Sequence, residues 1–347
     1  MNITALARPN IQRLTPYASG KDEFGGQAEI SLDTNENPYG DGVVNRYPDP
    51  LQQALCERIA AVKSAQFGTS LSAEQLALGN GSDELIDMLV RIFCEPGADA
   101  LAYCPPTFGM YQVVADLNDV GSVQIPLDAT FDLDVDGILA QNGAAKLLFL
   151  CSPNSPSGNR MTPERLQKLI AAWEGIVVLD EAYIDFCPQH SLVGQLAQFP
   201  QLVILQTFSK AWGMAGVRLG CALAGAEVIT LLRKVKMPYN IDALKARFVL
   251  DRLGDTARFE HEVGLIRSER ERLASELAAF AEEVFASEAN FLLVRFADGR
   301  RVYQHLLEHG VVTRDFSGKP GTADCLRISV GTPAENDRLL QLLSRLP

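Results

Sequence analysis

Short apolar runs alternate with helix-like stretches between residues 76 and 224, and this alternation constrains the fold more than any other feature of the sequence. The runs are rich in Val, Leu and Ile, and none is long enough to span a membrane. Such runs, separated by helices, are typical of a mostly parallel sheet that helices cover on both faces. We expect strands at residues 76–78, 100–103, 122–125, 146–150, 176–180, 202–207 and 220–224.

Two further patterns flank this region. Apolar residues recur at helical spacing after YPDP, which predicts a helix there; they are Leu51, Leu55, Ile59 and Val62. After Pro238 the chain changes character, with a charged helical stretch over about 242–284. The strand-like segments NFLLVRF, GVVTRDF and CLRISVG follow, with helices near 300–308 and from Pro333. This second pattern predicts a smaller α+β unit.

The sequence therefore predicts an α/β fold with two domains. A large domain over residues 31–240 would hold the mostly parallel sheet, and a small α+β domain would cover 241–347. Residues 1–30 are polar and turn-rich, and we expect an arm there. In such sheets the ligand lies outside the carboxyl ends of the strands.

Charge and cysteine content narrow the function. The formal net charge is −12, so nucleic acid and anionic membranes, which need a basic surface, are unlikely partners. The seven cysteines form no C-x-x-C pair, and their number is odd. This usage argues against a disulfide framework and favours a reducing cytoplasm.

Lys210 stands in the segment TFSKAWGMAGVRLG, among small and apolar residues that offer an ammonium little stabilisation. A lysine amine attacks carbonyl groups once burial or a nearby cation lowers its pKa. Ser209 and Arg218 in the same segment are suited to bind a phosphate. A phosphorylated aldehyde such as pyridoxal phosphate fits this combination.

The segment VVLDEAYIDF supplies two further groups that this cofactor needs. Asp180 follows four apolar residues at a predicted strand end, where a carboxylate is costly without a positive partner such as a protonated pyridine nitrogen. Tyr183 could donate to the ring oxygen. The alternative, that Asp180 caps a helix, is equally compatible with the sequence alone.

The segment GNGSDE follows a short predicted strand and opens a predicted helix. Gly81 permits close approach of the backbone, and Ser82 and Asp83 lie where free N–H groups attract a phosphate. The segment lacks the full dinucleotide and P-loop patterns. By itself it is also compatible with an ordinary capped helix.

Six segments together resemble the fold-type I pyridoxal-phosphate-dependent aminotransferases, in the order of that family and over nearly the whole chain. They are NRYPDP, GNGSDE, CPPTFGMY, SPNSPSG, VVLDEAYIDF and TFSKAWGMAGVRLG. The resemblance implies pyridoxal 5'-phosphate as the cofactor. Lys210 would bind its aldehyde and move the substrate proton, Asp180 would hold the ring nitrogen, Tyr183 the ring oxygen, and Phe108 would stack on the ring.

The resemblance also implies a phosphate-binding set and a homodimer. The set comprises Gly81, Ser82, Asp83, Thr207, Ser209 and Arg218. Tyr47 would reach the same phosphate from the neighbouring subunit. One segment departs from the family: SPNSPSG carries Ser155 where relatives usually have an asparagine that bonds the ring oxygen. Either Ser155 or the adjacent Asn154 would then make that contact.

Arg314 and Arg327 lie 13 residues apart (327 − 314 = 13) on two short predicted strands, so both could face one cleft and bind a carboxylate or phosphate. In the family such arginines bind histidinol phosphate and glutamate in turn, and Tyr17 would assist them. The resemblance thus implies that the arm over 1–30 contributes to the small domain and the active site. The reaction implied is transamination between histidinol phosphate and 2-oxoglutarate in histidine biosynthesis. The same arginines also suit aromatic amino acids, or decarboxylation of threonine phosphate.

Two other classes stay open. The segment HLLEH matches a zinc-peptidase pattern through His305, Glu308 and His309, although Gly310 follows at once and indicates a helix end. A regulator that keeps the cofactor fold for sensing is the third class, and the acidic charge disfavours its binding to DNA.

Overall fold

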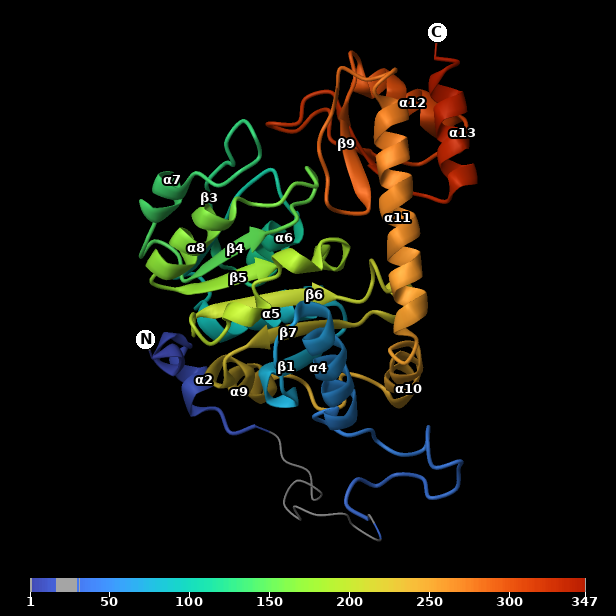
Figure 1. The fold of residues 1–347 in the computed structure, drawn as a ribbon. Helices are drawn as coiled ribbons and strands as arrows, with labels where there is room; N and C mark the ends of the chain where they lie inside the picture. The colour runs from blue at the N-terminus through green and yellow to red at the C-terminus, as the bar shows by residue number, and fades with distance from the viewer. Residues whose placement is uncertain (1, 17–29, 31, 347) are drawn as a thin grey trace.

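The computed structural model describes residues 2–16, 30 and 32–346, and these residues form two sheets (Figure 1). The large sheet has the strand order β1-β7-β6-β5-β4-β2-β3. Its strands are β1 (Leu76–Gly79), β2 (Ala100–Tyr103), β3 (Gly121–Gln124), β4 (Leu147–Cys151), β5 (Ile176–Asp180), β6 (Leu202–Thr207) and β7 (Gly220–Ala224). Only β7 runs antiparallel to its neighbours in this sheet. The predicted strands are confirmed to within one residue at each end.

Helices cover both faces of the large sheet, as predicted. One face carries α4 (Gln53–Phe67), α7 (Val135–Leu139) and α8 (Pro163–Ala172). The opposite face carries α5 (Ser82–Phe93), α6 (Met110–Leu117) and α9 (Ala226–Val235). Successive strand residues alternate between the two cores: Val177 packs on the first face and Val178 on the second. Double coverage explains why these strands are apolar without interruption.

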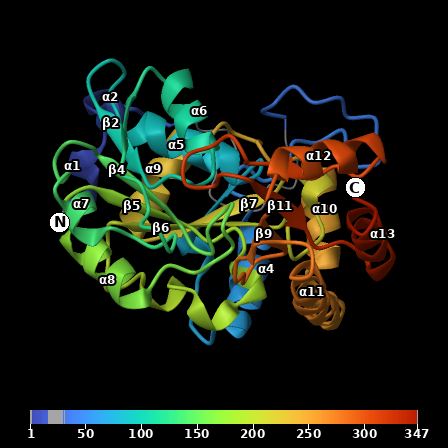
Figure 2. The ribbon, with the colours of Figure 1, turned by 90° about the horizontal axis from the view of Figure 1, so that it is seen from above.

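A second, four-stranded sheet forms the small unit, with the order β10-β11-β9-β8 and antiparallel pairing throughout. Its strands are β8 (Glu283–Val284), β9 (Phe291–Arg295), β10 (Arg314–Asp315) and β11 (Cys325–Ser329). The helices α12 (Gly299–Glu308) and α13 (Pro333–Leu343) pack on it and form a separate hydrophobic core. Figure 2, seen from above, shows this unit beside the large sheet.

The prediction of one helical stretch over 242–284 is wrong, because the structure has two separate helices there. They are α10 (Ala243–Arg252) and α11 (Thr256–Leu277), and the second ends before β8. The break falls at Gly254 and Asp255, where the Asp255 side chain accepts a hydrogen bond from the backbone N–H of Arg258 at 3.1 Å. A glycine followed by a capping aspartate starts a new helix here.

The long helix α11 joins the two units. It has 22 residues, so it spans roughly 33 Å. Phe259 and Val263 near its start pack in the core of the large unit, whereas Leu273 and Leu277 near its end pack in the core of the small unit. Figure 1 shows it running along the side of the molecule between both sheets.

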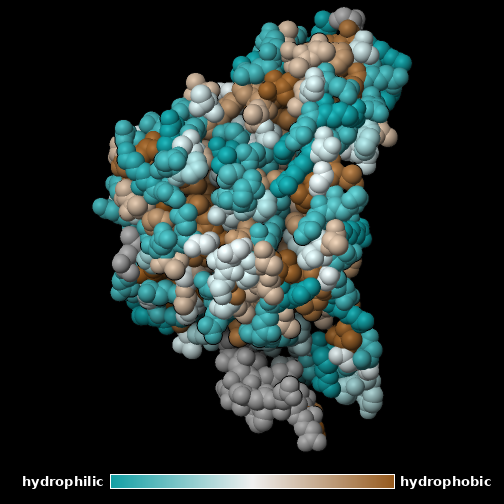
Figure 3. Space-filling view, viewed as in Figure 1, coloured by the Kyte–Doolittle hydropathy of each residue, from teal (hydrophilic) through white to brown (hydrophobic). Residues whose placement is uncertain are grey.

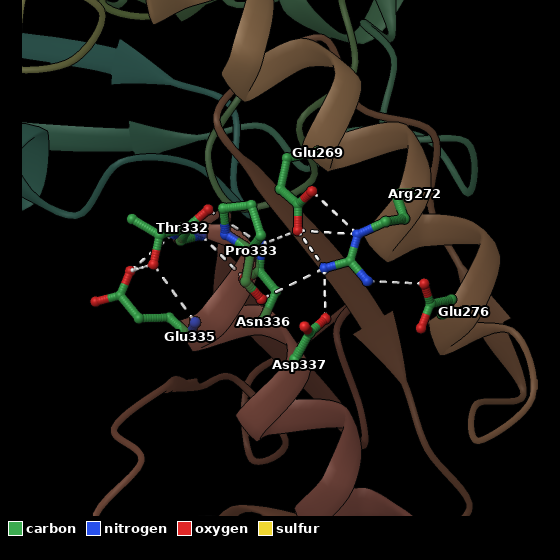
Figure 4. A network of polar contacts seen from close by, with 9 residues as sticks. Glu269, Arg272, Glu276, Thr332, Pro333, Glu335, Asn336 and Asp337 are labelled. Atoms are coloured by element: carbon green, nitrogen blue, oxygen red, sulfur yellow. Dashed lines mark hydrogen bonds and ion pairs between the residues drawn. The ribbon is translucent and has the colours of Figure 1, made fainter.

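Polar contacts fasten the end of α11 to the start of α13 (Figure 4). The Arg272 guanidinium forms ion pairs with Glu269 and Glu276 on its own helix and with Asp337 on α13, the last at 2.8 Å. The Asn336 amide donates to Glu269 at 2.9 Å. A capping box between Thr332 and its N3 glutamate starts α13. These contacts join α11 to α13 of the small unit.

The described start of the chain packs on the large unit. The short helices α1 (Ile3–Leu6) and α2 (Pro9–Arg13) lie against α9, and Ile3 and Ile11 are buried there. The division of the chain into an arm over 1–30, a large domain over 31–240 and a small domain over 241–347 remains our proposal.

Candidate active site

A pocket opens at the carboxyl ends of the large-sheet strands. Asp180 is the last residue of β5, Thr207 is the last residue of β6, and Lys210 lies in the loop that follows β6. The pocket collects ten of the predicted site residues and two others; its lining is Gly81, Ser82, Asp83, Phe108, Cys151, Asp180, Ala182, Tyr183, Thr207, Ser209, Lys210 and Arg218. Strand ends that meet at one sheet edge explain why residues so far apart in sequence converge.

Asp180 is buried at the floor of this pocket, with 2% of its surface exposed. Its Oδ2 accepts a hydrogen bond from the Tyr111 hydroxyl at 2.8 Å, and its Oδ1 accepts one from the backbone N–H of Ala182 at 3.0 Å. Burial raises the pKa of the Asp180 carboxyl to about 6, although both hydrogen bonds oppose the shift. The short helix that follows begins at Ile184 and receives no side-chain cap, so Asp180 is not a helix cap.

Tyr111 is a site residue that our sequence reasoning missed. It is fully buried on α6, and its ring stacks on Phe149 at 4.8 Å and meets the edge of Phe108 at 5.7 Å between centroids. Burial raises the pKa of its hydroxyl well above the ordinary value, so the group stays a donor to Asp180. Its place in CPPTFGMY, one helical turn after Phe108, was the available signal.

Lys210 lies beside Tyr183, with its Nζ 5.6 Å from the tyrosine ring centroid. Burial lowers the pKa of the Lys210 amine, and the positive charge of Arg327 lowers it further. Asp180 and Asp83 act in the opposite direction. A lower pKa increases the fraction of neutral amine, the form that attacks carbonyl carbon and accepts protons.

Tyr183 and Ser155 lie between the lysine and the small unit. Burial raises the pKa of the Tyr183 hydroxyl to about 12, so it is a hydrogen-bond donor. Ser155 Oγ accepts a hydrogen bond from Arg327 Nη1 at 2.7 Å. This bond joins the SPNSPSG loop of the large unit to β11 of the small unit.

Asn154 is turned away from the first pocket. Its amide nitrogen donates to Ser157 Oγ at 2.8 Å and to the Pro106 carbonyl at 3.0 Å, and its oxygen accepts from Thr107 Oγ1 at 2.8 Å. These bonds occupy the side chain and hold two loops together. Ser155 borders a neighbouring cavity instead of the first pocket. Which of the two would contact a cofactor ring stays a prediction.

The end of the pocket near α5 fits a phosphate. Gly81 has φ +79°, and a Cβ there would lie 2.7 Å from Arg218 Nη2. Arg218 itself adopts a left-handed conformation, which is strained for a residue with a side chain, and its Nη2 pairs with Asp83 at 2.9 Å. The buried Ser209 hydroxyl has no partner among the described residues. A buried polar atom without a partner beside a helix N-terminus fits a bound anion.

A second cavity borders the first and shares Phe108 with it. Arg314 and Arg327 stand directly opposite each other on β10 and β11, as their spacing predicted, and both line this cavity. Lys319 lines it as well, and no Asp or Glu occurs among the described residues of its wall. Three cations without a carboxylate are suited to an anionic ligand.

Among the described residues, Tyr47 lines neither cavity, and neither does Asn154. Tyr47 is 51% exposed and stacks on Tyr239 at 4.6 Å. Tyr17 lies outside the described residues.

The zinc-peptidase pattern lies on the small unit, at the end of α12. His305 Nε2 bonds the Leu342 carbonyl at 3.1 Å, and His309 Nδ1 bonds the His305 carbonyl at 2.8 Å. In the part of the chain that the structure describes, no three His, Cys, Asp or Glu residues are grouped to hold a metal ion. Backbone contacts at a helix end account for both histidines.

The fold and this site define a class of protein. The structure resembles a histidinol-phosphate aminotransferase from Sinorhizobium meliloti solved with pyridoxal 5'-phosphate, with a TM-score of 0.78 at 24% identity over 98% of each chain. A histidinol-phosphate aminotransferase from Clostridium acetobutylicum gives a TM-score of 0.79 at 24% identity, over 87% of this chain and 90% of that one. The fold is therefore that of the fold-type I aminotransferases.

Sequence comparison identifies the family. Residues 32–343 match the family described as aminotransferase class I and II, and the chain belongs to that family. It is 46% identical to the histidinol-phosphate aminotransferase of Cytophaga hutchinsonii, over 99% of this chain and 98% of the relative. It is 45% identical to the enzyme of that name from Parabacteroides distasonis, over 98% of each.

Proposed function

We propose that this chain is a pyridoxal-phosphate-dependent aminotransferase that converts L-histidinol phosphate and 2-oxoglutarate to imidazole acetol phosphate and glutamate in histidine biosynthesis. The observation that carries the proposal is the junction of the two cavities. The Lys210 amine, with its lowered pKa, lines the first pocket with buried Asp180, and three cations line the adjoining cavity. Relatives 40–46% identical over almost the whole chain bear the matching name.

The first pocket would hold the cofactor, which supplies an electron-accepting ring for the substrate's amino group. Asp180 would pair with the ring nitrogen, and that positive partner would keep the buried carboxylate ionised at neutral pH. Tyr111 would hold the carboxylate in place. Ser209, Arg218 and the free N–H groups at the start of α5 would bind the phosphate.

Lys210 would move the proton. Its neutral amine would take a proton from the substrate carbon that bears nitrogen and give it to the cofactor carbon joined to that nitrogen, as a general base and then a general acid. Burial and Arg327 both favour the neutral form that this step requires. Tyr183 would donate to the ring oxygen from the adjacent wall.

The second cavity would hold the substrate's anionic group. Arg327 would bind the carboxylate of glutamate, and Arg327 with Arg314 would bind the phosphate of histidinol phosphate. Because Arg327 of the small unit also donates to Ser155 of the large unit, a substrate bound to Arg327 would lie where the two units meet.

We also propose a cytoplasmic homodimer in which each subunit contributes to both sites. The segment over 32–51 projects at the lower right of Figures 1 and 3. Large apolar side chains are exposed on this segment and near the α9–α10 connection. They are Leu32, Tyr39, Val44, Met237, Leu244 and Phe248. A second copy would cover them and use Tyr47. All seven cysteines are free, which suits a reducing compartment. None of the described helices is long and apolar enough to cross a membrane.

A screen of half-reactions tests the substrate. The purified, cofactor-loaded protein is mixed separately with histidinol phosphate, phenylalanine and threonine phosphate, and the cofactor absorbance is followed. We expect histidinol phosphate to convert the chromophore fastest. Faster conversion by phenylalanine, or release of carbon dioxide from threonine phosphate, would assign the chain to the corresponding alternative.

A further inference from the structure

The turn between β10 and β11 has a defined shape. The backbone N–H of Lys319 donates to the Phe316 carbonyl at 3.0 Å, and the backbone N–H of Thr322 donates to the Lys319 carbonyl at 3.2 Å. The Thr322 side chain is fully buried and donates to the Phe316 carbonyl at 3.2 Å. Gly321 has φ +78°, and its Cβ position would lie 3.6 Å from Pro106 of the large unit. The turn therefore packs against the far wall of the second cavity.

Lys319 brings a third cation to this cavity. Its Nζ lies 5.6 Å from the centroid of the Phe316 ring, and Arg327 Cζ lies 5.7 Å from the same centroid. Phe316 thus supports two cations that line one space with Arg314. Burial lowers the pKa of Arg327, and the positive charge of Arg314 lowers it further. The two arginines therefore repel one another when no anion is bound.

Two neighbouring arginines of the small unit are neutralised, whereas the cations of the second cavity are not. Arg295 pairs with Glu283 at 2.7 Å, and Arg300 pairs with Asp315 at 3.2 Å. Arg314, Lys319 and Arg327 form no ion pair with any residue that the structure describes, in a chain with 43 acidic residues and 31 basic ones. Three unneutralised cations match a ligand with more than one negative charge.

The two proposed substrates differ in the charge of the anionic group nearest the amino-bearing carbon, although glutamate carries a second carboxylate at the end of its side chain. A phosphate monoester carries about −1.5 to −2 at pH 7, whereas the α-carboxylate of glutamate carries a single charge. The phosphate of histidinol phosphate also stands farther from the amino-bearing carbon, because a CH2–O link separates them. It can therefore reach beyond Arg327 toward the turn, where an α-carboxylate does not extend.

We propose that Lys319 is a specificity-determining residue that contacts the phosphate of the amino donor and does not contact the α-carboxylate of glutamate. The inference rests on the proposed function and deepens it. A lysine at this place adds a compact charge to the planar forks of the two arginines. It separates a phosphorylated substrate from its carboxylate co-substrate within one site.

The test compares K319M with wild type in single-turnover half-reactions. Methionine removes the charge and keeps the length of the side chain. We expect kcat/KM for histidinol phosphate to fall about tenfold, mostly through KM, because a charged hydrogen bond is lost. We expect the glutamate half-reaction to stay within about twofold. K319R should retain most of the histidinol phosphate rate, and inorganic phosphate should inhibit K319M more weakly than wild type.

K168M is the matched control, because Lys168 is an exposed lysine on α8 that pairs with Asp136, so the change in net charge is the same. It should leave both half-reactions unchanged. An equal loss with both substrates in K319M, or no loss with histidinol phosphate, would overturn the role of Lys319. A wild-type protein that does not react with histidinol phosphate would instead refute the proposed function.

Discussion

The two cavities differ in whether their charged side chains have partners within the protein. In the first, charged groups already have partners: buried Asp180 bonds Tyr111, and half-exposed Arg218 pairs with Asp83. In the second, Arg314, Lys319 and Arg327 line the wall without a carboxylate. The first stands at the strand ends of the large sheet, whereas the cations of the second stand on a hairpin of the small sheet.

This difference matches two kinds of ligand. A cofactor that remains bound through many turnovers is served by groups that the protein holds in place before binding. Substrates that enter and leave in turn are served by cations that become neutralised only when an anion arrives. Variants of each cavity should therefore separate the groups that serve the cofactor from those that serve the substrate.

The largest effect is expected for K210A. Removal of the amine takes away both the covalent anchor of the cofactor and the base that moves the proton, so transamination should fall more than about 10³-fold with every substrate. Stopped-flow measurement of both half-reactions checks this. A variant that still transaminates at a rate near that of wild type would remove Lys210 from the catalytic role.

R327A should affect the second cavity without emptying the first. Both glutamate and histidinol phosphate would lose their principal cation, and we expect kcat/KM to drop about 100-fold for each. Cofactor content, measured by absorbance, should stay close to wild type. A loss of kcat/KM for histidinol phosphate alone would contradict the proposal that Arg327 binds both substrates, whereas Lys319 binds only one.

The carboxyl of Asp180 predicts a pH effect in the cofactor-free protein. Its folded pKa of about 6 lies above the ordinary value of 3.8, so folding favours the protonated form. Its contribution to stability is full below pH 4 and is lost as pH rises through about 6. Relative to D180N, the free energy of unfolding of the wild type should therefore decrease by roughly 2–3 kcal/mol over this range.

Urea unfolding of both cofactor-free proteins at pH 4, 5, 6 and 7 measures this difference. Binding of the cofactor should abolish the loss, because its ring nitrogen gives the carboxylate a positive partner. Parallel pH profiles of the two cofactor-free proteins would show that burial does not perturb Asp180.

The smallest effect is expected for Y111F. The variant keeps the ring that packs on Phe149 and Phe108 but removes the hydroxyl that bonds Asp180. Asp180 would retain only the bond from Ala182, and its pKa would rise further. We expect about a tenfold loss of kcat and a pH dependence of stability that extends to higher pH than in wild type. An unchanged stability profile would show that the hydroxyl does not hold the carboxylate.

The sequence predicted the large sheet from local signals, and it predicted most of the first cavity from local motifs together with the resemblance to a family. Strand β5 and the carboxylate at its end follow from one apolar run that ends in Asp180. The pairing of Arg314 with Arg327 followed from two short strands at hairpin spacing. Such features need only residues close together in the chain.

What the sequence did not reveal depends on long-range contact. Tyr111 reaches Asp180 across 69 positions, and its place in CPPTFGMY indicates the site but not that partner. Asn154 sits beside Ser155, yet bonds to Pro106 and Thr107 turn it away from the pocket. The break between α10 and α11 was missed because the charged pattern continues through Gly254. Lys319 entered no motif, since its position relative to the arginines becomes visible only when the hairpin is folded.

The most direct test of the whole account is to locate the cofactor on the chain. The purified protein is loaded with pyridoxal 5'-phosphate, treated with borohydride, digested and examined by mass spectrometry, with K210A in parallel. The account predicts a phosphopyridoxyl group on Lys210 in the wild type and no such group in the variant. A wild-type protein that takes up no cofactor, or that carries the group on another lysine such as buried Lys63, would contradict it.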